Sequence, residues 1–425
     1  MIDIDLLRKN PETFVRGSKN KNINIDIDEV LELDKRWRDV LRETEDMRAK
    51  QNFFGEGVSS EKSEARKREM IEELKNIKDQ IKTKEIEESI LKEKLDKMIR
   101  RIPNPPFDGV IIGKDENDNK VLREIGLKPF FNFKFKNYIE IGEELDLIDT
   151  ERAAKVSGTR FGYLKGGAAV LEFALIQYAF DILMKEGFVP IVPPVLVKPE
   201  AIQAMGYVER GGDEIYFLEK DNIYLVGTSE QSIGPMHKDE IFEEKELPKR
   251  YVAFSSCFRR EAGSHGKDTR GILRVHQFDK LEMFCITTPE KSKEEHQFLL
   301  SLEERLMQGL KIPYRVLDIC SGDLGDPAAA KYDIEAWIPS QDTYRETHSS
   351  SNTTDFQSRR LNIRYRPKGQ EKGTRFVHML NGTAFAIGRM IIAILENYQQ
   401  ADGSIVIPEV LQKYMPGHKD IISKK

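Results

Sequence analysis

The sequence predicts an α+β protein, in which helices pack on an antiparallel sheet and a long hairpin of two helices precedes this body. Three observations lead to this prediction. Apolar residues recur at alternating steps of three and four along residues 30–54 and again along residues 70–102, as they do in paired helices. Several later segments alternate between polar and apolar residues, as strands do. Helical patterns lie between those strands, which favours an antiparallel sheet covered by helices.

The N-terminal region is predicted to be helical. Residues 1–28 offer one short amphipathic helix that Pro11 breaks, and then a polar loop. Residues 55–57, which include two glycines, are expected to form the turn of the long hairpin, with Ser59 or Ser60 as the N-cap of its second helix. The predicted apolar seams consist of Val30, Leu33, Trp37, Val40, Thr44, Met47, Gln51 and Phe54 in the first helix, and of Met70, Leu74, Ile77, Ile81, Lys84, Glu88, Leu91, Leu95, Met98 and Ile102 in the second.

The hairpin buries little on its free faces, so we expect it to project from the body as an antiparallel coiled-coil arm. Gln51, Lys84 and Glu88 interrupt the apolar seam, and packing should weaken there. A dimerisation coil or a spacer is the alternative interpretation. The charges of the arm are nearly balanced, although residues 65–68 form a short basic patch near the expected tip.

Prolines mark the end of the arm. Pro103, Pro105 and Pro106 stop the second helix, because proline cannot continue it. We therefore divide the chain into an N-terminal domain of residues 1–102, with the arm at about residues 29–102, a linker and start of the body at residues 103–160, and a main domain at residues 161–425. In the body, helices are expected at residues 168–185, 291–310 and 384–399, and strands at residues 250–260, 273–286, 331–338 and 362–365.

The composition indicates a soluble protein with a large core. The chain has 425 residues, 33% of them charged, and a net charge of −5, so any surface that binds nucleic acid must be local. Cys257, Cys285 and Cys320 are far apart, which indicates a reducing compartment without disulfides. No apolar run is expected to approach the roughly 18 residues that span a bilayer, and the acidic N-terminus lacks a signal-peptide pattern. We expect a cytoplasmic protein that does not associate with membranes.

The most informative segment is residues 273–283, which follows residues 258–261 and a polar loop that contains Gly263, Gly266 and Gly271. If residues 273–283 form a strand, one face of it carries Arg274, His276, Phe278, Lys280 and Glu282. Burying such charges without partners costs several kcal/mol, so this face is predicted to be the floor of a site for a charged ligand. A solvated hairpin face is the alternative. Arg259 and Glu261 on the neighbouring strand add a second cation–carboxylate pair.

Three further polar segments fit such a site. Residues 228–230 follow an apolar strand, and residues 344–352 form a dense polar run after another strand, for which a solvated turn is the alternative. Residues 380–383 are placed at a strand-to-helix junction, with Arg389 in the second helical turn. There the alternative is a helix start capped by Asn381 or Thr383.

The motifs that the sequence lacks narrow the chemistry. It contains neither of the glycine-rich nucleotide-binding patterns G-x-x-x-x-G-K-[ST] and G-x-G-x-x-G, nor the H-E-x-x-H metal motif. Its seven histidines are scattered, and no grouping of a nucleophile with a base is identifiable. Arginines, carboxylates and one aromatic residue without a nucleophile suit a reaction between two bound substrates. Phosphoryl or nucleotidyl transfer fits, because positioning and charge neutralisation supply most of its catalysis.

The arm, residues 258–264, residues 274–282, residues 345–349 and residues 380–383 together resemble the seryl-tRNA synthetases of the bacterial type, a family of class II aminoacyl-tRNA synthetases. The resemblance runs from the first residue to beyond Pro408. It implies a class II catalytic domain at residues 161–425 and a tRNA-binding arm before it. It also implies three class II motifs: residues 168–194 at a dimer interface, the hairpin of residues 259–282, and residues 382–389.

The resemblance further implies roles for single residues. For ATP, it assigns Arg259 to the α-phosphate, Glu261 to the adenine amino group, Phe278 to stacking on adenine, Val275 to a nucleotide contact and Arg389 to the γ-phosphate, with Arg260, Thr347, His348 and Ser349 as further contacts. Glu346 is implied as the Mg²⁺ ligand. For serine, Arg274 is implied for the carboxylate and Glu282 for the ammonium, with Thr228, Ser229, Glu230, Asn381 and Thr383 completing the pocket. Arg259, Arg389 and Glu346 are the expected catalytic residues.

The expected activity is therefore the ATP- and Mg²⁺-dependent ligation of L-serine to serine tRNA through a seryl-adenylate, and serine charging of selenocysteine tRNA where that tRNA is present. A homodimer with tRNA bound across both protomers is implied. Two departures from the family are the segment 205–212, in place of a G-T-G-like loop, and Ser350, in place of a frequent cysteine. The alternatives are a ligase that acts on a carrier protein, whose members lack the long arm, and a catalytically inactive relative, which would be expected to lose the charged pocket residues.

Overall fold

The computed structural model describes residues 2–263, 268, 270–369, 372–417 and 420–423. By its contacts the chain forms two compact units. One consists of Ile2–Lys19 and Ile23–Pro103, and the other of Asn20–Asn22 and Asn104–Lys425. Gly266, which was predicted to belong to the glycine-containing loop, lies outside the described residues, as do Ser264 and His265.

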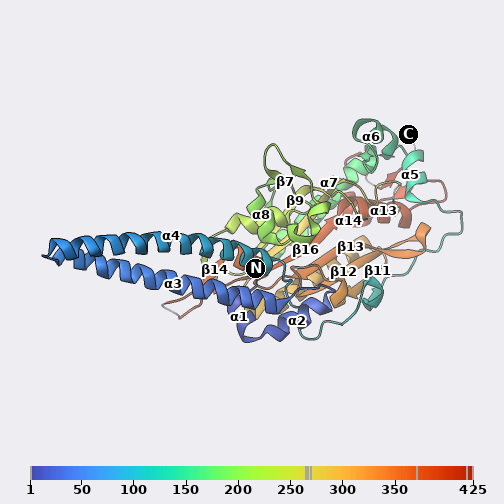
Figure 1. Ribbon diagram of the computed structural model, residues 1–425. Coiled ribbons are helices and arrows are strands. Elements are labelled where there is room, and N and C mark those ends of the chain that lie inside the picture. Colours follow the sequence, from blue (N-terminus) through green and yellow to red (C-terminus); the bar gives the residue numbers. More distant parts are fainter. Residues whose placement is uncertain (1, 264–267, 269, 370–371, 418–419, 424–425) are drawn as a thin grey trace. The chain divides into compact units, whose positions relative to one another are not determined.

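The smaller unit consists of helices, as predicted. They are α1 (Ile4–Lys9), α2 (Pro11–Asn20), α3 (Ile27–Ser60) and α4 (Glu64–Arg100). The helices α3 and α4 run antiparallel, side by side (Figure 1). Val30, Leu33 and Val40 of α3 are buried, as are Leu91 and Leu95 of α4. The coiled-coil arm and its predicted seam are thereby confirmed.

The position of the turn in the arm differs from the prediction. The helix α3 continues through both glycines to Ser60, and α4 begins only at Glu64. Ser59 and Ser60 lie at the end of α3, where their hydroxyls donate to the carbonyls of Gly55 and Glu56 over 3.2 and 3.3 Å. Each of these is a bond from a serine hydroxyl to the carbonyl four residues earlier in the same helix, so neither serine caps the start of α4.

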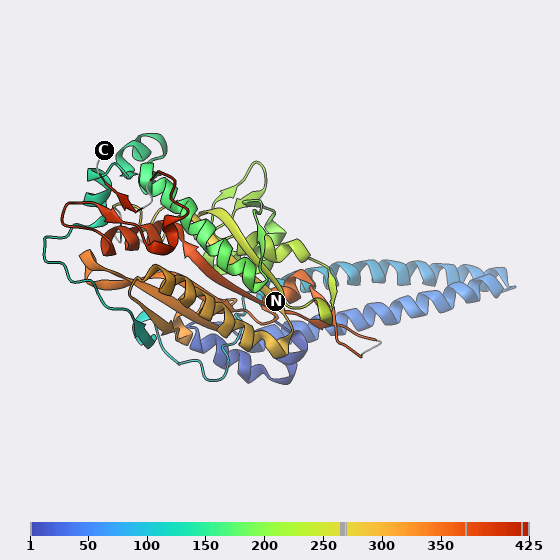
Figure 2. The same ribbon diagram turned by 180° about the vertical axis from the view of Figure 1, so that it is seen from behind.

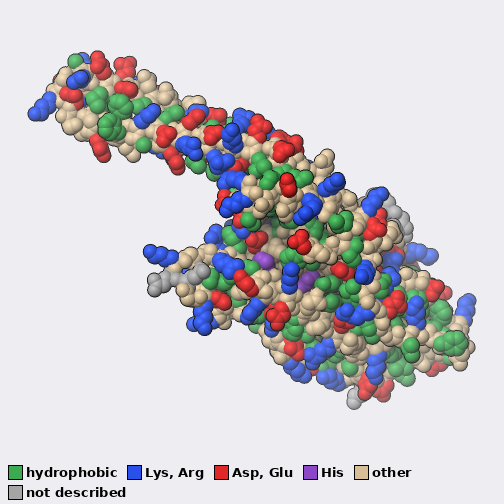
Figure 3. All heavy atoms as spheres, turned by 90° about the horizontal axis from the view of Figure 1, so that it is seen from below, with side chains coloured by type: hydrophobic (Ala, Val, Ile, Leu, Met, Phe, Trp, Pro, Cys, Tyr) green, Lys and Arg blue, Asp and Glu red, His purple; other side chains and the backbone are tan. Residues whose placement is uncertain are grey.

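Charges of both signs alternate over the surface of the arm (Figure 3). One of them, Lys84, interrupts the apolar seam as predicted. Its ammonium pairs with Glu43 across the hairpin over 2.8 Å and with Glu87 over 3.1 Å. The seam therefore tolerates this charge, because carboxylates on both helices neutralise it.

The larger unit is built on an eight-stranded sheet. Its strands, in spatial order, are β1 (Lys120–Ile125), β11 (Tyr314–Asp318), β12 (Ala330–Ile338), β13 (Thr343–Asn352), β16 (His378–Ala386), β10 (Gln277–Thr287), β9 (Lys249–Phe258) and β4 (Val189–Ile191). All neighbours are antiparallel except β4 and β9, which are parallel. The predicted α+β class with an antiparallel sheet is confirmed.

Three helices cover one face of this sheet: α7 (Gly166–Leu183), α11 (Ser292–Leu310) and α13 (Ile387–Asn397) (Figure 2). Their apolar sides and the underlying strands form one core, to which Leu171, Leu306 and Ile391 belong. Because the helices lie on one face, the other face of the central strands is available for a site.

Shorter elements surround the sheet. They include α5 (Tyr138–Glu144), α6 (Thr150–Ser157), α8 (Pro199–Met205), α9 (Val208–Gly211), α10 (Glu230–Ile233), α12 (Phe356–Leu361), α14 (Glu409–Gln412), β2 (Ile148–Asp149), β3 (Tyr163–Leu164), β5 (Leu196–Val197), β6 (Phe217–Leu218), β7 (Ile223–Leu225), β8 (Ile241–Glu243), β14 (Arg364–Arg366), β15 (Arg375–Phe376), β17 (Ile405–Val406) and β18 (Ile421–Ile422).

Three predicted boundaries in this unit are wrong. The strand β10 begins at Gln277, four residues later than predicted. Residues 344–352 were expected to follow a strand, but they lie within β13. Residues 384–386, expected to start a helix, continue β16, so Arg389 lies in the first turn of α13 instead of the second. The polar segments of residues 344–352 and 380–383 therefore form part of the sheet itself.

The expectation that no apolar run reaches bilayer length is also wrong. The helical stretch Gly166–Glu186, which includes α7, is long and apolar enough to cross a membrane by length and composition. Half of it is buried inside the protein, however, where Leu171 and Leu175 pack in the core. A buried core helix of a folded domain has the same length and composition, so this stretch is only weak evidence for a membrane-spanning segment.

Candidate active site

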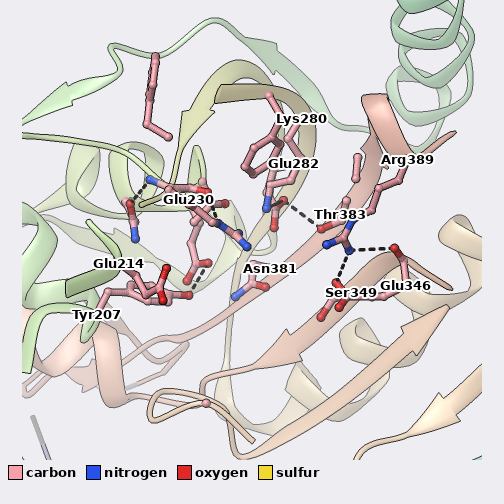
Figure 4. A pocket seen from close by; sticks show the side chains of 18 of the residues that line it. Tyr207, Glu214, Glu230, Lys280, Glu282, Glu346, Ser349, Asn381, Thr383 and Arg389 are labelled. Atoms are coloured by element: carbon pink, nitrogen blue, oxygen red, sulfur yellow. Dashed lines mark hydrogen bonds and ion pairs between the residues drawn. The ribbon is translucent and has the colours of Figure 1, made fainter. Parts of the chain in front are cut away.

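A cavity of about 620 Å³ opens on the face of the sheet opposite the covering helices. Side chains of β9, β10, β13 and β16 line it, together with the start of α13 and the segments that precede α9 and α10 (Figure 4). Strands that are distant in sequence thus bring their polar residues into one space.

The floor of the cavity is formed by β10. Phe278, Lys280 and Glu282 all line the cavity, which agrees with the alternation predicted for a strand. Lys280 and Glu282 are buried, and the ammonium of Lys280 lies 2.5 Å from Oε2 of Glu282. Glu282 is also directly opposite Thr383 in the sheet, and the Thr383 hydroxyl donates to the same Oε2 over 3.3 Å.

Arg274 and His276 precede β10, so they do not belong to the predicted row. Arg274 lines the cavity, but its guanidinium pairs with the carboxylate of Glu261, and not with Glu282. His276 shares a hydrogen bond of 3.0 Å with the carbonyl of Arg259. The cation beside Glu282 is Lys280, which the sequence analysis placed in the charged row without assigning it to a substrate group.

Arg259 lies immediately after the end of β9 and lines the cavity. Its Nε donates to the carbonyl of Gly227 over 3.2 Å, and its guanidinium lies 5.3 Å from the centre of the Phe278 ring. Arg260 does not line the cavity, and its Nε donates to the carbonyl of Ile215 over 3.0 Å. A flat ring and a cation side by side can hold a base and a phosphate group.

A β-bulge in β13 decides which polar residues of that strand reach the cavity. Glu346 is opposite Glu335 and His348 is opposite Ile334, so Thr347 is an extra residue. As a result, Glu346 and Thr347 both line the cavity although they are adjacent in sequence. His348 falls on the other side and is fully buried, with its ring 5.6 Å from that of Phe385.

Glu346 is surrounded by cations. Arg389 donates to its backbone carbonyl over 2.8 Å, and the same nitrogen lies 3.4 Å from its carboxylate (Figure 4). The Glu346 side chain is 48% exposed and lines the cavity. The cavity walls remove part of the water around this carboxyl, which alone would raise its pKa, but the charges of Arg389, Lys331 and Arg259 hold the pKa below the usual value. Glu346 is therefore a carboxylate at neutral pH.

The segment of residues 228–230 follows β7, as predicted, and enters α10. The hydroxyl of Thr228 is buried at the cavity wall and has no hydrogen-bond partner among the described residues. Ser229 is fully buried and does not line the cavity. Glu230 is buried, and burial together with the nearby Glu282 raises its pKa to about 7.

Most of the predicted site residues come together in this cavity. Those that line it are Thr228, Glu230, Arg259, Glu261, Arg274, Val275, Phe278, Glu282, Glu346, Thr347, Ser349, Asn381, Thr383 and Arg389. Ser229, Arg260 and His348 do not. Lys280 of the predicted charged row and Ser351 of the predicted polar run also line it, and the prediction missed Tyr207, Gln231, Lys331 and Thr353. The alternation of β10 placed Lys280 on the cavity face, whereas no pattern in the sequence singled out Tyr207.

Comparison with known proteins identifies relatives of the whole chain. Residues 1–106 match the family model of the seryl-tRNA synthetase N-terminal domain, and residues 216–398 match that of the class II tRNA synthetase core domain of the G, H, P, S and T type. A serine–tRNA ligase of Fervidobacterium nodosum is 45% identical over 98% of both chains. One of Dictyoglomus turgidum is 44% identical over the full length of both.

Solved structures show the same similarity. The seryl-tRNA synthetase of Pyrococcus horikoshii, complexed with ATP, superposes with a TM-score of 0.89 at 39% identity and covers both chains completely. The cytoplasmic serine–tRNA ligase of Naegleria fowleri, in complex with AMP, has a TM-score of 0.87 at 35% identity over 100% of this chain and 99% of that one.

Proposed function

The chain belongs to the seryl-tRNA synthetase family, whose reaction is the ATP-dependent ligation of serine to its tRNA, and we propose that the cavity on the sheet catalyses both steps of this reaction. The protein is accordingly an aminoacyl-tRNA synthetase that uses ATP. The observation that carries the proposal is the arrangement of the cavity. It holds the Lys280–Glu282 pair near Thr228 and Glu230, and it also holds Arg259, Phe278, Glu346 and Arg389.

In the first step, the carboxylate of serine attacks the α-phosphorus of ATP, the bond to the β-phosphate breaks, and pyrophosphate leaves. Glu282 and Glu230 supply negative charge for the ammonium of serine, and Thr228 offers a hydroxyl with an open hydrogen-bonding position. Arg259 and Arg389 neutralise phosphate charge, and Phe278 offers its ring to adenine. Because no protein nucleophile takes part, rate acceleration comes from positioning and charge neutralisation.

We propose Glu346 as the protein ligand of Mg²⁺ in this step. Its ionised carboxylate and the hydroxyl of Ser349 on the same strand are oxygen donors, which Mg²⁺ prefers. Among the described residues, no group of three or more acidic, histidine or cysteine side chains could hold a metal by itself. This suits Mg²⁺, which is commonly bound by one or two carboxylates together with substrate phosphates. The ion would neutralise phosphate charge when ATP is present.

In the second step, a terminal ribose hydroxyl of tRNA attacks the carbonyl carbon of seryl-adenylate, and AMP leaves. We propose that residues 1–102 form the tRNA-binding domain, in which the arm of about residues 29–102 contacts tRNA by shape and phosphates. We also propose that residues 103–160 lead into a catalytic domain of residues 161–425. The acceptor is serine tRNA, and selenocysteine tRNA where that tRNA is present.

We further propose a homodimer, in which the arm of one protomer presents tRNA to the partner's cavity. Phe173 of α7 and Val192, which follows β4, support this interface because they are 67% and 80% exposed although apolar. A cytoplasmic location is proposed as well. The three cysteines are free, which suits a reducing compartment.

The test is ATP–pyrophosphate exchange with a panel of amino acids, followed by charging of serine tRNA. We expect exchange with serine, weaker exchange with threonine and alanine, and transfer of serine to its tRNA. Alanine is penalised because it leaves pocket groups that serve the serine hydroxyl without a partner. Exchange that prefers another amino acid, or activation of serine without transfer to tRNA, would contradict the proposal.

A further inference from the structure

The carboxylate of Glu230 receives one hydrogen bond on each of its oxygens, from two different elements. The hydroxyl of Tyr207, which precedes α9, donates to Oε2 over 2.9 Å. The side-chain amide of Gln357 on α12 donates to Oε1 over 2.7 Å. Tyr207 and Glu230 both line the cavity, whereas Gln357 is fully buried behind it. Both hydrogen bonds favour the ionised carboxylate, which accepts on both oxygens.

The charged groups around Glu230 leave its ionisation finely balanced. Lys280 and Glu282 face it from β10, and Tyr207 and Gln357 face it from the segment before α9 and from α12. Burial and Glu282 raise its pKa, whereas Gln357, Tyr207 and Lys280 lower it, and the result is a pKa of about 7. Loss of a single donor therefore changes the charge of Glu230 near neutral pH.

The segment that carries Tyr207 is fixed by ion pairs to neighbouring elements. Glu209 accepts a hydrogen bond from Nη1 of Arg360 over 3.2 Å, and Arg360 lies on the same helix, α12, as Gln357. Arg210 donates from Nε to Asp326 over 2.7 Å. These contacts hold the Tyr207 hydroxyl in a position from which it donates a hydrogen bond to Glu230. This segment is also where the sequence departs from the family pattern at residues 205–212.

We propose that Tyr207 and Gln357 are positioning residues that keep the Glu230 carboxylate ionised and oriented toward the ammonium group of bound serine. This inference rests on the proposed function, because it requires serine at the Glu230 end of the cavity. An ionised Glu230 attracts the ammonium, whereas a neutral one offers no charge to it. The role is separate from adenine and phosphate binding, because Tyr207 and Gln357 are not among the residues assigned to ATP.

The test is the variant Tyr207→Phe, which removes one donor and keeps the ring. The pKa of Glu230 then rises, and a larger fraction of the enzyme has a neutral Glu230 at pH 6.5–7. We expect the KM for serine in ATP–pyrophosphate exchange to rise at least about fivefold at pH 6.5–7, and the difference to fall below about twofold at pH 8.5. The KM for ATP should stay unchanged. Gln357→Met, which removes the other donor, should shift the pH profile in the same direction.

A matched control is Tyr224→Phe on β7, whose ring packs 4.5 Å from that of Phe217 and which does not line the cavity. It should behave as the wild-type protein at every pH. A Tyr207→Phe variant with an unchanged KM for serine, or with the same loss at every pH, would overturn the inference. If the wild-type protein itself fails to activate serine, the proposed function fails, and the two results are therefore distinguishable.

Discussion

The ion pair between Lys280 and Glu282 is better explained by function than by stability. Both side chains are buried at the floor of the cavity. Removing two charges from water costs several kcal/mol per ion, and their mutual attraction often only compensates for this cost. A buried ion pair in the floor of the cavity is useful when zwitterionic serine binds. The carboxylate of Glu282 can then pair with the ammonium of serine, and Lys280 remains as a neighbouring cation.

This explanation predicts the effect of Glu282→Gln. The amide keeps the volume but cannot attract an ammonium, so the KM for serine in ATP–pyrophosphate exchange should rise at least about 100-fold, which corresponds to about 3 kcal/mol. The KM for ATP should change less than about threefold. Glu282→Ala should in addition lower the free energy of unfolding by roughly 3–5 kcal/mol, because Lys280 is left buried without a partner. Normal serine saturation in Glu282→Gln would remove Glu282 from the serine pocket.

A buried histidine makes the protein sensitive to acid. His296 on α11 is buried, and its Nε2 donates to the carbonyl of Ser350 over 3.0 Å. Burial lowers its pKa from the ordinary 6.5 to about 4. Because the folded state binds this proton less readily than the unfolded state, the stability that depends on neutral His296 is complete above pH 6.5 and is lost as the pH falls toward 4.

We therefore expect the loss of Tm between pH 7 and pH 4 to be smaller in His296→Gln than in the wild-type protein. Glutamine can still donate to the Ser350 carbonyl but takes up no proton. The difference in the free energy of unfolding between these pH values should be at most about 3 kcal/mol. Thermal melts followed by circular dichroism at several pH values measure it. Parallel pH profiles of the two proteins would show that His296 titrates normally.

At the scale of elements, local patterns predicted which segments are strands and which are helices, but they did not predict where an element ends or where a strand contains a β-bulge. The alternation of β10 placed Phe278, Lys280 and Glu282 on one face, because side chains of a strand alternate regardless of the neighbouring strands. The bulge in β13 is different. It arises from pairing with β12, and it brings Glu346 and Thr347 to the same cavity while His348 enters the core.

The arm is an element whose role can be separated from the cavity. Replacing residues 44–81 by a short glycine-rich turn removes the distal part of α3 and α4 and keeps the paired segments near residues 29 and 94, where Lys94 and Glu29 form an ion pair. We expect serine-dependent pyrophosphate exchange to stay within about twofold of the wild-type rate. Charging of serine tRNA, measured as kcat/KM for tRNA, should fall at least about 100-fold.

A control for this truncation is the double variant Lys220→Ala/Lys245→Ala, which removes two exposed charges of the larger unit and leaves the arm intact. It should lose much less charging activity than the truncated arm. If truncation reduced exchange and charging equally, the arm would be needed for the integrity of the cavity, and its proposed role in tRNA binding would lose its support.

At the scale of the whole molecule, the exposed apolar residues of α7 and of the segment after β4 predict an association of two chains. The double variant Phe173→Glu/Val192→Asp places charges on this surface, and their burial in an interface is unfavourable. In sedimentation velocity, the wild-type protein should have about twice the chain mass of 49.0 kDa, and the variant should have the mass of one chain. Exchange activity should fall if the cavity depends on the partner.

The control for this experiment is Ile112→Glu, a residue that is 74% exposed and lies outside the proposed interface segments. It should remain a dimer. A wild-type protein that sediments as a single chain, or a Phe173→Glu/Val192→Asp variant that remains a dimer, would contradict the proposed interface.

The sequence by itself determined the arm, the sheet class and the majority of the residues in the cavity. Each depends on a local pattern: the steps of three and four along α3 and α4, the alternation along β10, and polar motifs short enough to be recognised. Only the tertiary structure decided that Lys280 is the partner of Glu282, that Arg274 pairs with Glu261, and that Tyr207 reaches Glu230. The alternation of β10 places Lys280 and Glu282 on the same face, but which cation neutralises which carboxylate depends on all the segments that meet at the cavity. The other two contacts join segments that are distant in sequence, and no local pattern encodes them.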